Sequence, residues 1–156
     1  MKPDLLAAPL CIALLVFAGC GPLGPFPGRA LSGEVKPTPA DWSFVANVEQ
    51  AQLETNPVDP RSTNIWLGSQ NGALYISSSM IYGPKLPSER GWVRDVEADE
   101  RVRLRVDGGL YELRAERVLD EAEAAAARSM LERKYELGPD DLDPEREVWV
   151  WRLEPR

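Results

Sequence analysis

The stretch RVRLRVDGGLYELRA, residues 101–115, decides the fold, because it alternates charged and apolar side chains on both sides of a glycine pair. Strict alternation is typical of a strand with one buried face, and Gly108-Gly109 suits a tight hairpin turn. With that tip, the apolar pairs are Val106 with Tyr111, Leu104 with Leu113, and Val102 with Ala115. The charged face pairs Arg105 with Glu112 and Arg101 with Glu116, and it sets Arg103 against Arg114. Because most pairs agree on this register, the sequence predicts an antiparallel hairpin.

A helix is predicted directly after the hairpin. Asp120 is a good N-cap residue, and Glu123 stands three positions later, as in a capping box. Residues 121–135 have high helix propensity, and Gly138-Pro139 ends the segment. The apolar stripe of this helix is interpreted as a packing face; it comprises Ala127, Met130, Leu131 and Tyr135.

The other elements are marked less sharply. Further strands are predicted at 48–55, 63–68, 73–78 and 147–153, and Gln70-Asn71-Gly72 is a hairpin signal between two of them. A short helix is predicted at 89–98. The last strand is apolar on both faces, so we expect it to be covered on both sides. Six strands with one short and one longer helix predict a mainly β protein, a small closed or nearly closed barrel.

The N-terminus has the features of a lipoprotein signal peptide. Residues 5–17 are mostly apolar but too few to remain as a membrane-spanning helix, and Phe17-Ala18-Gly19-Cys20 resembles a lipobox. We therefore expect a signal peptide at 1–19, a lipid on Cys20, a Gly/Pro-rich tether at 20–31 and one domain at 32–156. The protein would lie in the cell envelope, anchored to a membrane. Because Gly21 rather than aspartate follows Cys20, the periplasmic side of the outer membrane is favoured.

Composition excludes several kinds of chemistry. The chain has no histidine, which removes Ser-His-Asp and Cys-His catalysis and the usual zinc and haem sites. Its two cysteines are Cys11, which leaves with the signal peptide, and Cys20, which would be acylated, so no disulfide is expected. The net charge of -7 argues against nucleic acid as a partner. No catalytic residue is assigned.

Four segments together resemble the flavin-binding split-barrel superfamily, which includes pyridoxamine phosphate oxidase-like proteins and deazaflavin-dependent nitroreductases. They are NIWL (64–67), GALYISS (72–78), GWVRDVEADERVRLRV (91–106) and GLYELRA (109–115). The resemblance covers roughly residues 41–135 and implies a six-stranded split barrel. The chain departs from the family at Asp95, where Asn is common, and at Asp99-Glu100, which replaces Asn-Pro. Residues 81–87 look like a lengthened loop where flavin phosphate contacts often lie.

The resemblance implies FMN or a deazaflavin as cofactor and, since relatives are often dimers, a homodimer. Such a cofactor needs cations for its phosphate and a flat wall for its ring. The candidate binding residues are Trp66, Ser78, Lys85, Arg90, Trp92 and Arg94. The alternative is that Trp92 packs in the core and that the three cations are solvated surface charge.

Two classes of function follow. One is a membrane-anchored lipoprotein whose barrel binds a small molecule or a protein without catalysis, which the export and the departures from the family favour. The other is a flavin- or deazaflavin-dependent oxidoreductase, which the resemblance favours. An acidic cluster, Asp140-Asp141-Asp143, could attract calcium, but it lacks the glycine and terminal glutamate of an EF-hand loop, and a solvated turn is the favoured interpretation.

Overall fold

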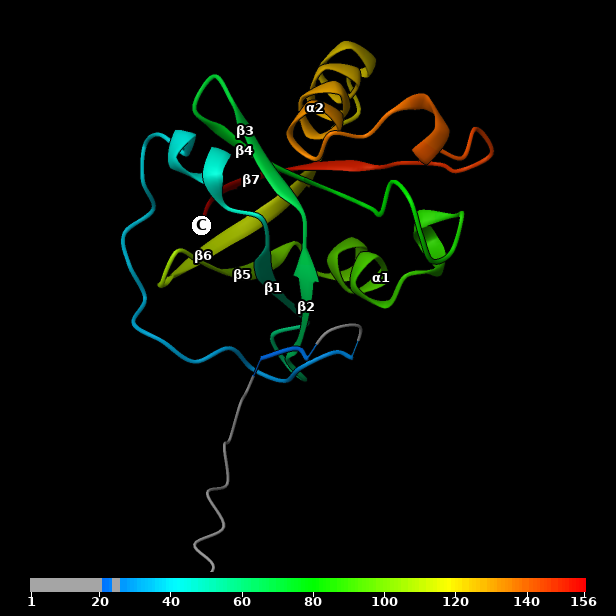
Figure 1. Ribbon diagram of the computed structural model, residues 1–156. Coiled ribbons are helices and arrows are strands. Elements are labelled where there is room, and N and C mark those ends of the chain that lie inside the picture. The colour runs from blue at the N-terminus through cyan, green and yellow to red at the C-terminus, as the bar shows by residue number, and fades with distance from the viewer. Residues whose placement is uncertain (1–20, 24–25) are drawn as a thin grey trace, which may run out of the picture.

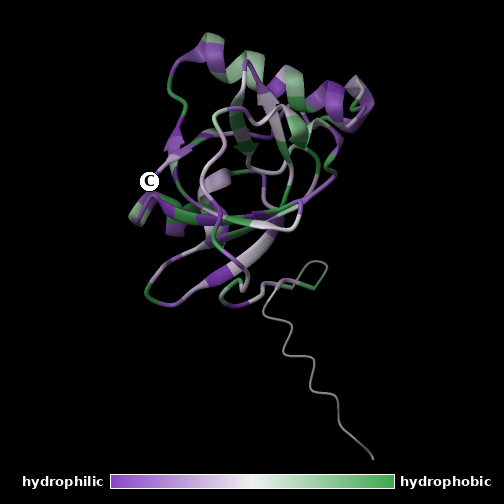
Figure 2. Ribbon diagram, turned by 90° about the vertical axis from the view of Figure 1, so that its left-hand side faces the viewer, coloured by the Kyte–Doolittle hydropathy of each residue, from purple (hydrophilic) through white to green (hydrophobic). Residues whose placement is uncertain are grey.

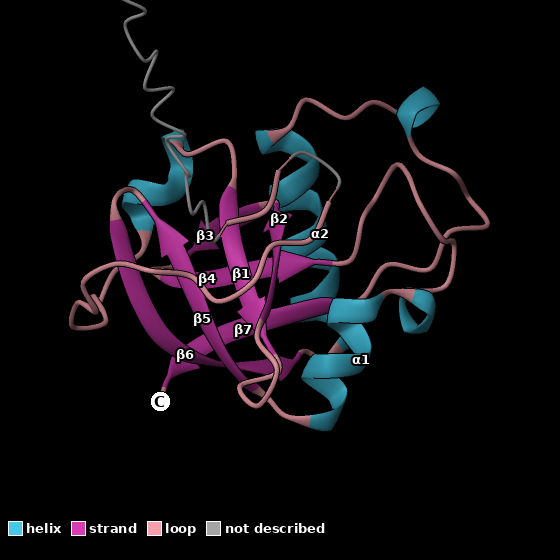
Figure 3. Ribbon diagram, turned by 90° about the horizontal axis from the view of Figure 1, so that it is seen from below, coloured by secondary structure: helices cyan, strands magenta, loops and turns pink. Residues whose placement is uncertain are grey.

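The computed structural model describes residues 21–23 and 26–156. Within them, seven strands form one curled antiparallel sheet in the order β2-β1-β5-β6-β7-β4-β3, and α1 and α2 lie outside it (Figures 1 and 3). The strands are β1 Ala51–Thr55, β2 Arg61–Ile65, β3 Leu67–Gln70, β4 Ala73–Ser77, β5 Arg101–Val106, β6 Gly109–Arg117 and β7 Val150–Pro155. The α-helices are α1 Gly91–Ala98 and α2 Glu121–Lys134, and short 3-10 helices lie at Ser43–Asn47, Pro87–Glu89 and Pro139–Asp141. The mainly β class with two helices is confirmed, but the strand number of six is wrong.

The additional strand arises at Trp66. The segment predicted as one strand at 63–68 is divided there, so that β2 pairs with β1 and β3 pairs with β4. These two strands are the opposite edges of the sheet, so the curled sheet is joined at this point by the chain itself rather than by a strand ladder. Periodicity in the sequence cannot show that two halves of an apolar run bond to different neighbours.

The hairpin of β5 and β6 has a different register from the predicted one. Its turn is Asp107-Gly108, both with positive φ (47° and 70°), which fits the Asp-Gly preference of a type I′ turn. Val106 therefore faces Gly109, and the whole register is moved by two residues. A shift of two leaves every side chain on its predicted face but changes its partner. The predicted pairs of Arg105 with Glu112 and Arg101 with Glu116 are wrong, because Arg105 faces Leu110 and Arg101 faces Arg114.

The core fills the inside of the curled sheet (Figure 2 colours its hydrophobic residues green). Leu53, Leu104, Leu113 and Trp151 are fully buried there, and α1 closes one side with Val93 and Val96. Fully burying one such aliphatic side chain contributes about 1.5–3 kcal/mol, so this cluster is the main source of stability.

Helix α2 is capped at its N-terminus and packs against β3 through its C-terminal half. The Asp120 carboxylate accepts a hydrogen bond of 2.8 Å from the Glu123 backbone N–H, which confirms the predicted N-cap. Gly68 leaves room for Met130, whose sulfur would lie 2.3 Å from a Cβ at that glycine. At the last turn, the Lys134 ammonium donates to the carbonyls of Val45, Val48 and Leu67 at 2.8, 2.7 and 2.6 Å. These contacts place Tyr135 beside the break at Trp66.

Candidate functional site

The candidate site is a cavity of about 580 Å³ beside the break between β2 and β3. Its walls come from β2, from the residues that follow β4, and from the chain that leads into α1. The lining residues are Gln50, Thr63, Asn64, Ile65, Trp66, Ser77, Ser78, Ser79, Tyr82, Gly83, Arg90 and Trp92. The volume lies within the range of about 300–1,000 Å³ that is usual for small-molecule and cofactor sites.

Trp66 gives the cavity a rigid aromatic wall. Its ring stacks on Tyr135 with centroids 4.1 Å apart and planes 8° apart, and Tyr82 meets it edge-on at 6.4 Å. The Tyr135 hydroxyl donates to the Glu49 carbonyl at 2.8 Å and accepts from the Leu67 N–H at 3.0 Å. Burial raises the pKa of Tyr135 to about 12. Because Tyr135 is fixed by its hydroxyl, it holds the indole of Trp66 in one orientation.

Trp92 has both of the roles considered from the sequence. It packs edge-on against the buried Trp151, with ring centroids 4.9 Å apart, so part of it belongs to the core. Its remaining surface lines the main cavity and also a neighbouring one of about 440 Å³. Trp92 therefore separates two cavities and can contact a ligand in either.

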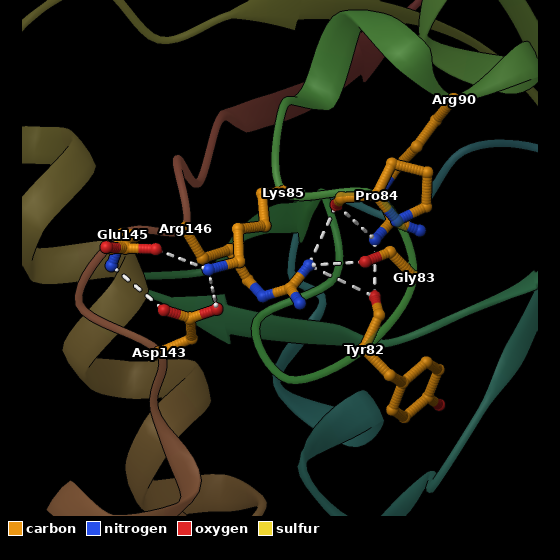
Figure 4. Close-up of polar contacts among 8 residues, drawn as sticks. All are labelled: Tyr82, Gly83, Pro84, Lys85, Arg90, Asp143, Glu145 and Arg146. Carbon is orange, nitrogen blue, oxygen red and sulfur yellow. Dashed lines mark hydrogen bonds and ion pairs between the residues drawn. The ribbon is translucent and has the colours of Figure 1, made fainter.

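Two arginines converge on the loop that borders the cavity (Figure 4). Arg90 Nη2 donates to the carbonyls of Tyr82 and Pro84 at 2.5 and 3.2 Å. Arg146 Nη1 donates to the carbonyls of Tyr82, Gly83 and Pro84 at 3.3, 3.2 and 2.8 Å. Figure 4 shows the two guanidinium groups reaching these oxygens from different segments, one ahead of α1 and one ahead of β7.

Neither arginine has a carboxylate within ion-pair distance in the described part of the chain. Burial and the positive charge of Arg146 lower the pKa of Arg90. The buried Nε of Arg146 has no hydrogen-bond partner among the same residues. Carbonyl oxygens hold both guanidinium groups, and a nearby opposite charge is Asp143, whose pKa Arg146 helps to lower without a direct ion pair. The positive charge of the two arginines is therefore only partly offset, and such a region favours an anion.

The structure brings some of the predicted binding residues together and separates others. Trp66, Ser78, Arg90 and Trp92 line the main cavity. Ser78 is almost fully buried, and its hydroxyl accepts a hydrogen bond of 2.9 Å from the Trp149 N–H, so part of its bonding capacity serves β7.

Lys85 and Arg94 do not line this cavity. Lys85 forms ion pairs with Asp143 at 3.0 Å and Glu145 at 2.6 Å, and both carboxylates raise its pKa (Figure 4). Arg94 lies on α1 one turn after Arg90; it lines the neighbouring cavity and donates to the Glu89 carbonyl at 2.9 Å.

Sequence reasoning did not identify Arg146, Tyr82 or Tyr135 as parts of this site. Tyr82 lies in the lengthened loop at 81–87, which was the available signal for it. Arg146 and Tyr135 are far from the cavity in the sequence, and only the fold brings them near it. Tyr135 was assigned to a packing face, and its stacking on Trp66 extends that face to the cavity.

The curled sheet with its two helices defines a split-barrel fold with a ligand-sized cavity beside Trp66. Among solved structures, it is similar to a conserved hypothetical protein from Mycobacterium tuberculosis, at 15% identity and a TM-score of 0.56 over 81% of this chain and 86% of the other. It is also similar to an F420 reductase, at 15% identity and a TM-score of 0.52 over 77% and 96% of the two chains. A third likeness is to a putative pyridoxamine 5′-phosphate oxidase from Listeria innocua, at 13% identity and a TM-score of 0.50 over 72% and 88%.

These likenesses establish the fold and confirm the split-barrel resemblance seen in the sequence. No protein-family model matches the chain, and a comparison with curated proteins gives no match. The predicted signal peptide at 1–19 and the predicted lipid attachment site at Cys20 lie outside the described residues. Among the residues that are described, no helix is long and apolar enough to cross a membrane.

Proposed function

We propose that the main cavity binds a flavin or deazaflavin cofactor and that the protein is an oxidoreductase that works through it. The observation that carries this proposal is the meeting of a rigid aromatic wall with Arg90, which lines the cavity and forms no ion pair with the described residues, while Arg146 holds the same bordering loop. A flavin has a flat ring and, in its phosphorylated form, an anionic tail, which match these two features. The bound cofactor would supply the hydride chemistry, so the absence of histidine does not count against redox activity.

The lining residues fit such a group. Trp66 and Trp92 offer aromatic surface for a ring, and Arg90 offers a charged donor for an anionic tail. The side chains of Ser77 and Ser79 add further donors at the cavity wall. The neighbours with this fold include proteins named as an F420 reductase and as a putative pyridoxamine 5′-phosphate oxidase, which supports a cofactor of this class here.

The test is a titration of the chain from Gly21 to Arg156 with FMN, a deazaflavin and riboflavin. Quenching of tryptophan fluorescence measures binding. We expect at least one phosphorylated cofactor to bind, and Arg90→Met to weaken it about tenfold or more, since a charged hydrogen bond contributes about 1.5–3 kcal/mol. Riboflavin, which has no phosphate, should lose little. Arg94→Met is the matched control, because that arginine faces the other cavity. If no cofactor binds at high micromolar concentration, the oxidoreductase proposal fails.

A second candidate function is ligand binding without catalysis. The observation in its favour is that the residues that line the main cavity include no carboxylate and no lysine, so the protein itself offers little acid–base chemistry there. The two candidates differ in one measurement. A bound cofactor that is reduced and reoxidised by added substrates supports the enzyme, whereas a bound cofactor that stays inert supports the binding protein.

We further propose that the chain is a lipoprotein held to the cell envelope through Cys20, with the periplasmic side of the outer membrane favoured. The lipobox at 17–20 supports this. Cys20→Ser should abolish labelling by radioactive palmitate and release the protein from membranes. An unlabelled and soluble wild-type protein would exclude the anchor.

A further inference from the structure

Residues 28–31, the last part of the predicted tether, are bound along the barrel. Gly28 and Ser62 exchange two backbone hydrogen bonds of 2.8 and 3.0 Å, and the Ser62 hydroxyl donates to the Arg29 carbonyl at 2.7 Å. Leu31 is 3% exposed, and its carbonyl accepts a bond of 2.9 Å from Arg103. The later part of the predicted tether is therefore fixed to β2 and β5, and the barrel can have only a limited range of orientations relative to an anchor at Cys20.

Between this fixed point and Cys20 lies an exposed apolar pair. Leu23 and Phe26 exchange two backbone hydrogen bonds of 3.2 and 3.1 Å, and they are 78% and 71% exposed. Pro22, beside them, is buried, and it packs closely against Gly28. Figure 2 shows hydrophobic ribbon on both sides of the short grey trace at the lower end of the molecule. The two large side chains are thus exposed to water, which costs hydrophobic free energy unless another phase covers them.

A third exposed apolar residue belongs to the same end. Val58 lies in the loop between β1 and β2 and is 90% exposed. That loop leads into Ser62, which pairs with Gly28, so the two segments are neighbours (Figure 1, lower end). Two exposed arginines, Arg29 and Arg61, flank the same pairing; Arg61 forms an ion pair of 3.1 Å with the exposed Asp59, so Arg29 is the main positive charge at this end. Apolar side chains with arginines beside them are typical of a surface that meets the headgroup region of a lipid bilayer.

We propose that this end of the barrel is a membrane-contact surface, in which Leu23, Phe26 and Val58 enter the lipid interface beside the acyl chains of Cys20. The inference rests on the proposed lipid anchor. Position 23 is three residues from Cys20, and an extended chain spans at most about 3.3–3.6 Å per residue, so Leu23 stays within about 11 Å of the acylated cysteine. A bilayer is therefore the phase that this pair meets first. The contact would fix the orientation of the barrel. The neighbouring cavity of about 440 Å³, which Pro27 and Arg61 help to line, would then face the membrane.

The first experiment uses the full lipidated chain. Because Cys11 leaves with the signal peptide and the Cys20 thiol is acylated, a new cysteine is the single free thiol of the mature protein. A polarity-sensitive fluorophore is attached at Phe26→Cys and, as a control, at Leu119→Cys. Leu119 is 79% exposed, matching Leu23, and lies just ahead of α2, which is at the other end of the molecule from the N-terminal segment (Figure 1). The mass of the N-terminal peptide reports acylation.

In liposomes of phosphatidylethanolamine and phosphatidylglycerol, the probe at position 26 should shift to the blue and be protected from an aqueous quencher, and the probe at 119 should not. Acylated protein with equal accessibility at the two positions would overturn the contact surface while leaving the anchor intact. A probe at 26 on the unacylated Cys20→Ser chain that is already shielded in buffer without lipid would show that another protein copy covers the pair, and this too would overturn the proposal.

A second experiment makes the contact independent of the anchor. The Cys20→Ser chain from residue 20 onward is partitioned onto the same vesicles. Exchanging Leu23, Phe26 and Val58 for serine together should weaken partitioning about tenfold or more, since three apolar side chains lose their burial, and Leu119→Ser should not. If Cys20 carries no lipid but partitioning depends on these three residues, the anchor fails and the contact surface stands. If the Cys20→Ser chain and its triple serine variant partition equally, and the probe at 26 is accessible in liposomes, the contact surface fails.

Discussion

Two groups of arginines in this protein differ in what neutralises them. On β5, Arg103 forms a two-bond ion pair with Glu54 of β1, Nε to Oε1 at 2.7 Å and Nη2 to Oε2 at 2.6 Å. Beside the cavity, Arg90 and Arg146 reach only the carbonyl oxygens of the loop at 82–84. A carbonyl carries a partial charge and cannot cancel a full one. The Arg103 charge is therefore neutralised within the fold, whereas the charges of Arg90 and Arg146 are offset only in part, by the nearby Asp143, and remain available to a ligand.

Burial makes the β5 pair a structural one. Glu54 is 5% exposed, and its carboxylate also accepts a hydrogen bond from the Leu31 N–H. Arg103 in turn donates to the Leu31 carbonyl. The pair therefore holds β1, β5 and the N-terminal segment together, and removing one partner would leave a buried charge without compensation.

The largest expected effect follows from that burial. Arg103→Met should lower the free energy of unfolding by about 3–5 kcal/mol, because the Glu54 carboxylate then stays buried without a counterion. Arg105→Met, on the same strand and face, is the control. Arg105 bonds only the neutral Gln52 side chain and the Ser32 carbonyl, so its loss should cost about 1 kcal/mol. Urea denaturation of both variants measures the difference. Equal losses of unfolding free energy would mean that the Arg103–Glu54 ion pair stabilises the fold no more than the Arg105 hydrogen bonds do.

A smaller effect is expected at the loop. Arg90→Met should cost under about 1 kcal/mol, because residues 82–84 are exposed, so water can replace the lost bonds, and the repulsion from Arg146 disappears. The same variant should respond differently to an anion. Pyrophosphate should raise the melting temperature of the wild type by binding the folded state, and this rise should be absent in Arg90→Met and unchanged in Arg94→Met. A rise that persists in Arg90→Met would show that these loop charges are not the ones that bind.

The same contrast explains how much the sequence could predict. The alternation at 101–115 predicted the correct faces of the hairpin, and four of the six candidate binding residues from the split-barrel resemblance line the cavity. The register could not be predicted, because Asp107-Gly108 and Gly108-Gly109 both suit a tight turn. Nor could the partner of each cation be predicted. Lys85, Arg90 and Arg94 look alike in the sequence, and only tertiary contacts from Asp143 and Glu145 neutralise the first of them.

Lys134 is an intermediate case and gives the smallest predicted effect. It is half-buried and, like the loop arginines, donates only to carbonyls, those of Val45, Val48 and Leu67. Burial lowers its pKa from 10.5 to about 8. Between these two pH values, the unfolded chain therefore holds a proton that the folded protein has released, so the free energy of unfolding should rise as the pH increases through this window.

The Lys134 effect can be isolated by choice of pH and by a variant. Burial raises the pKa of Tyr135 from its ordinary 10.0 to about 12, so above pH 10 this residue makes the free energy of unfolding fall as the pH increases. The Lys134 effect should therefore be measured between about pH 8 and about pH 9.5. Lys134→Met should be less stable at pH 8, since three carbonyls lose their donor, and should show no rise with pH. Denaturation curves at closely spaced pH values test this. If the free energy of unfolding of the wild type changes with pH as little as that of the variant, Lys134 keeps its proton in the folded protein. Three carbonyl oxygens would then be enough to stabilise a half-buried positive charge.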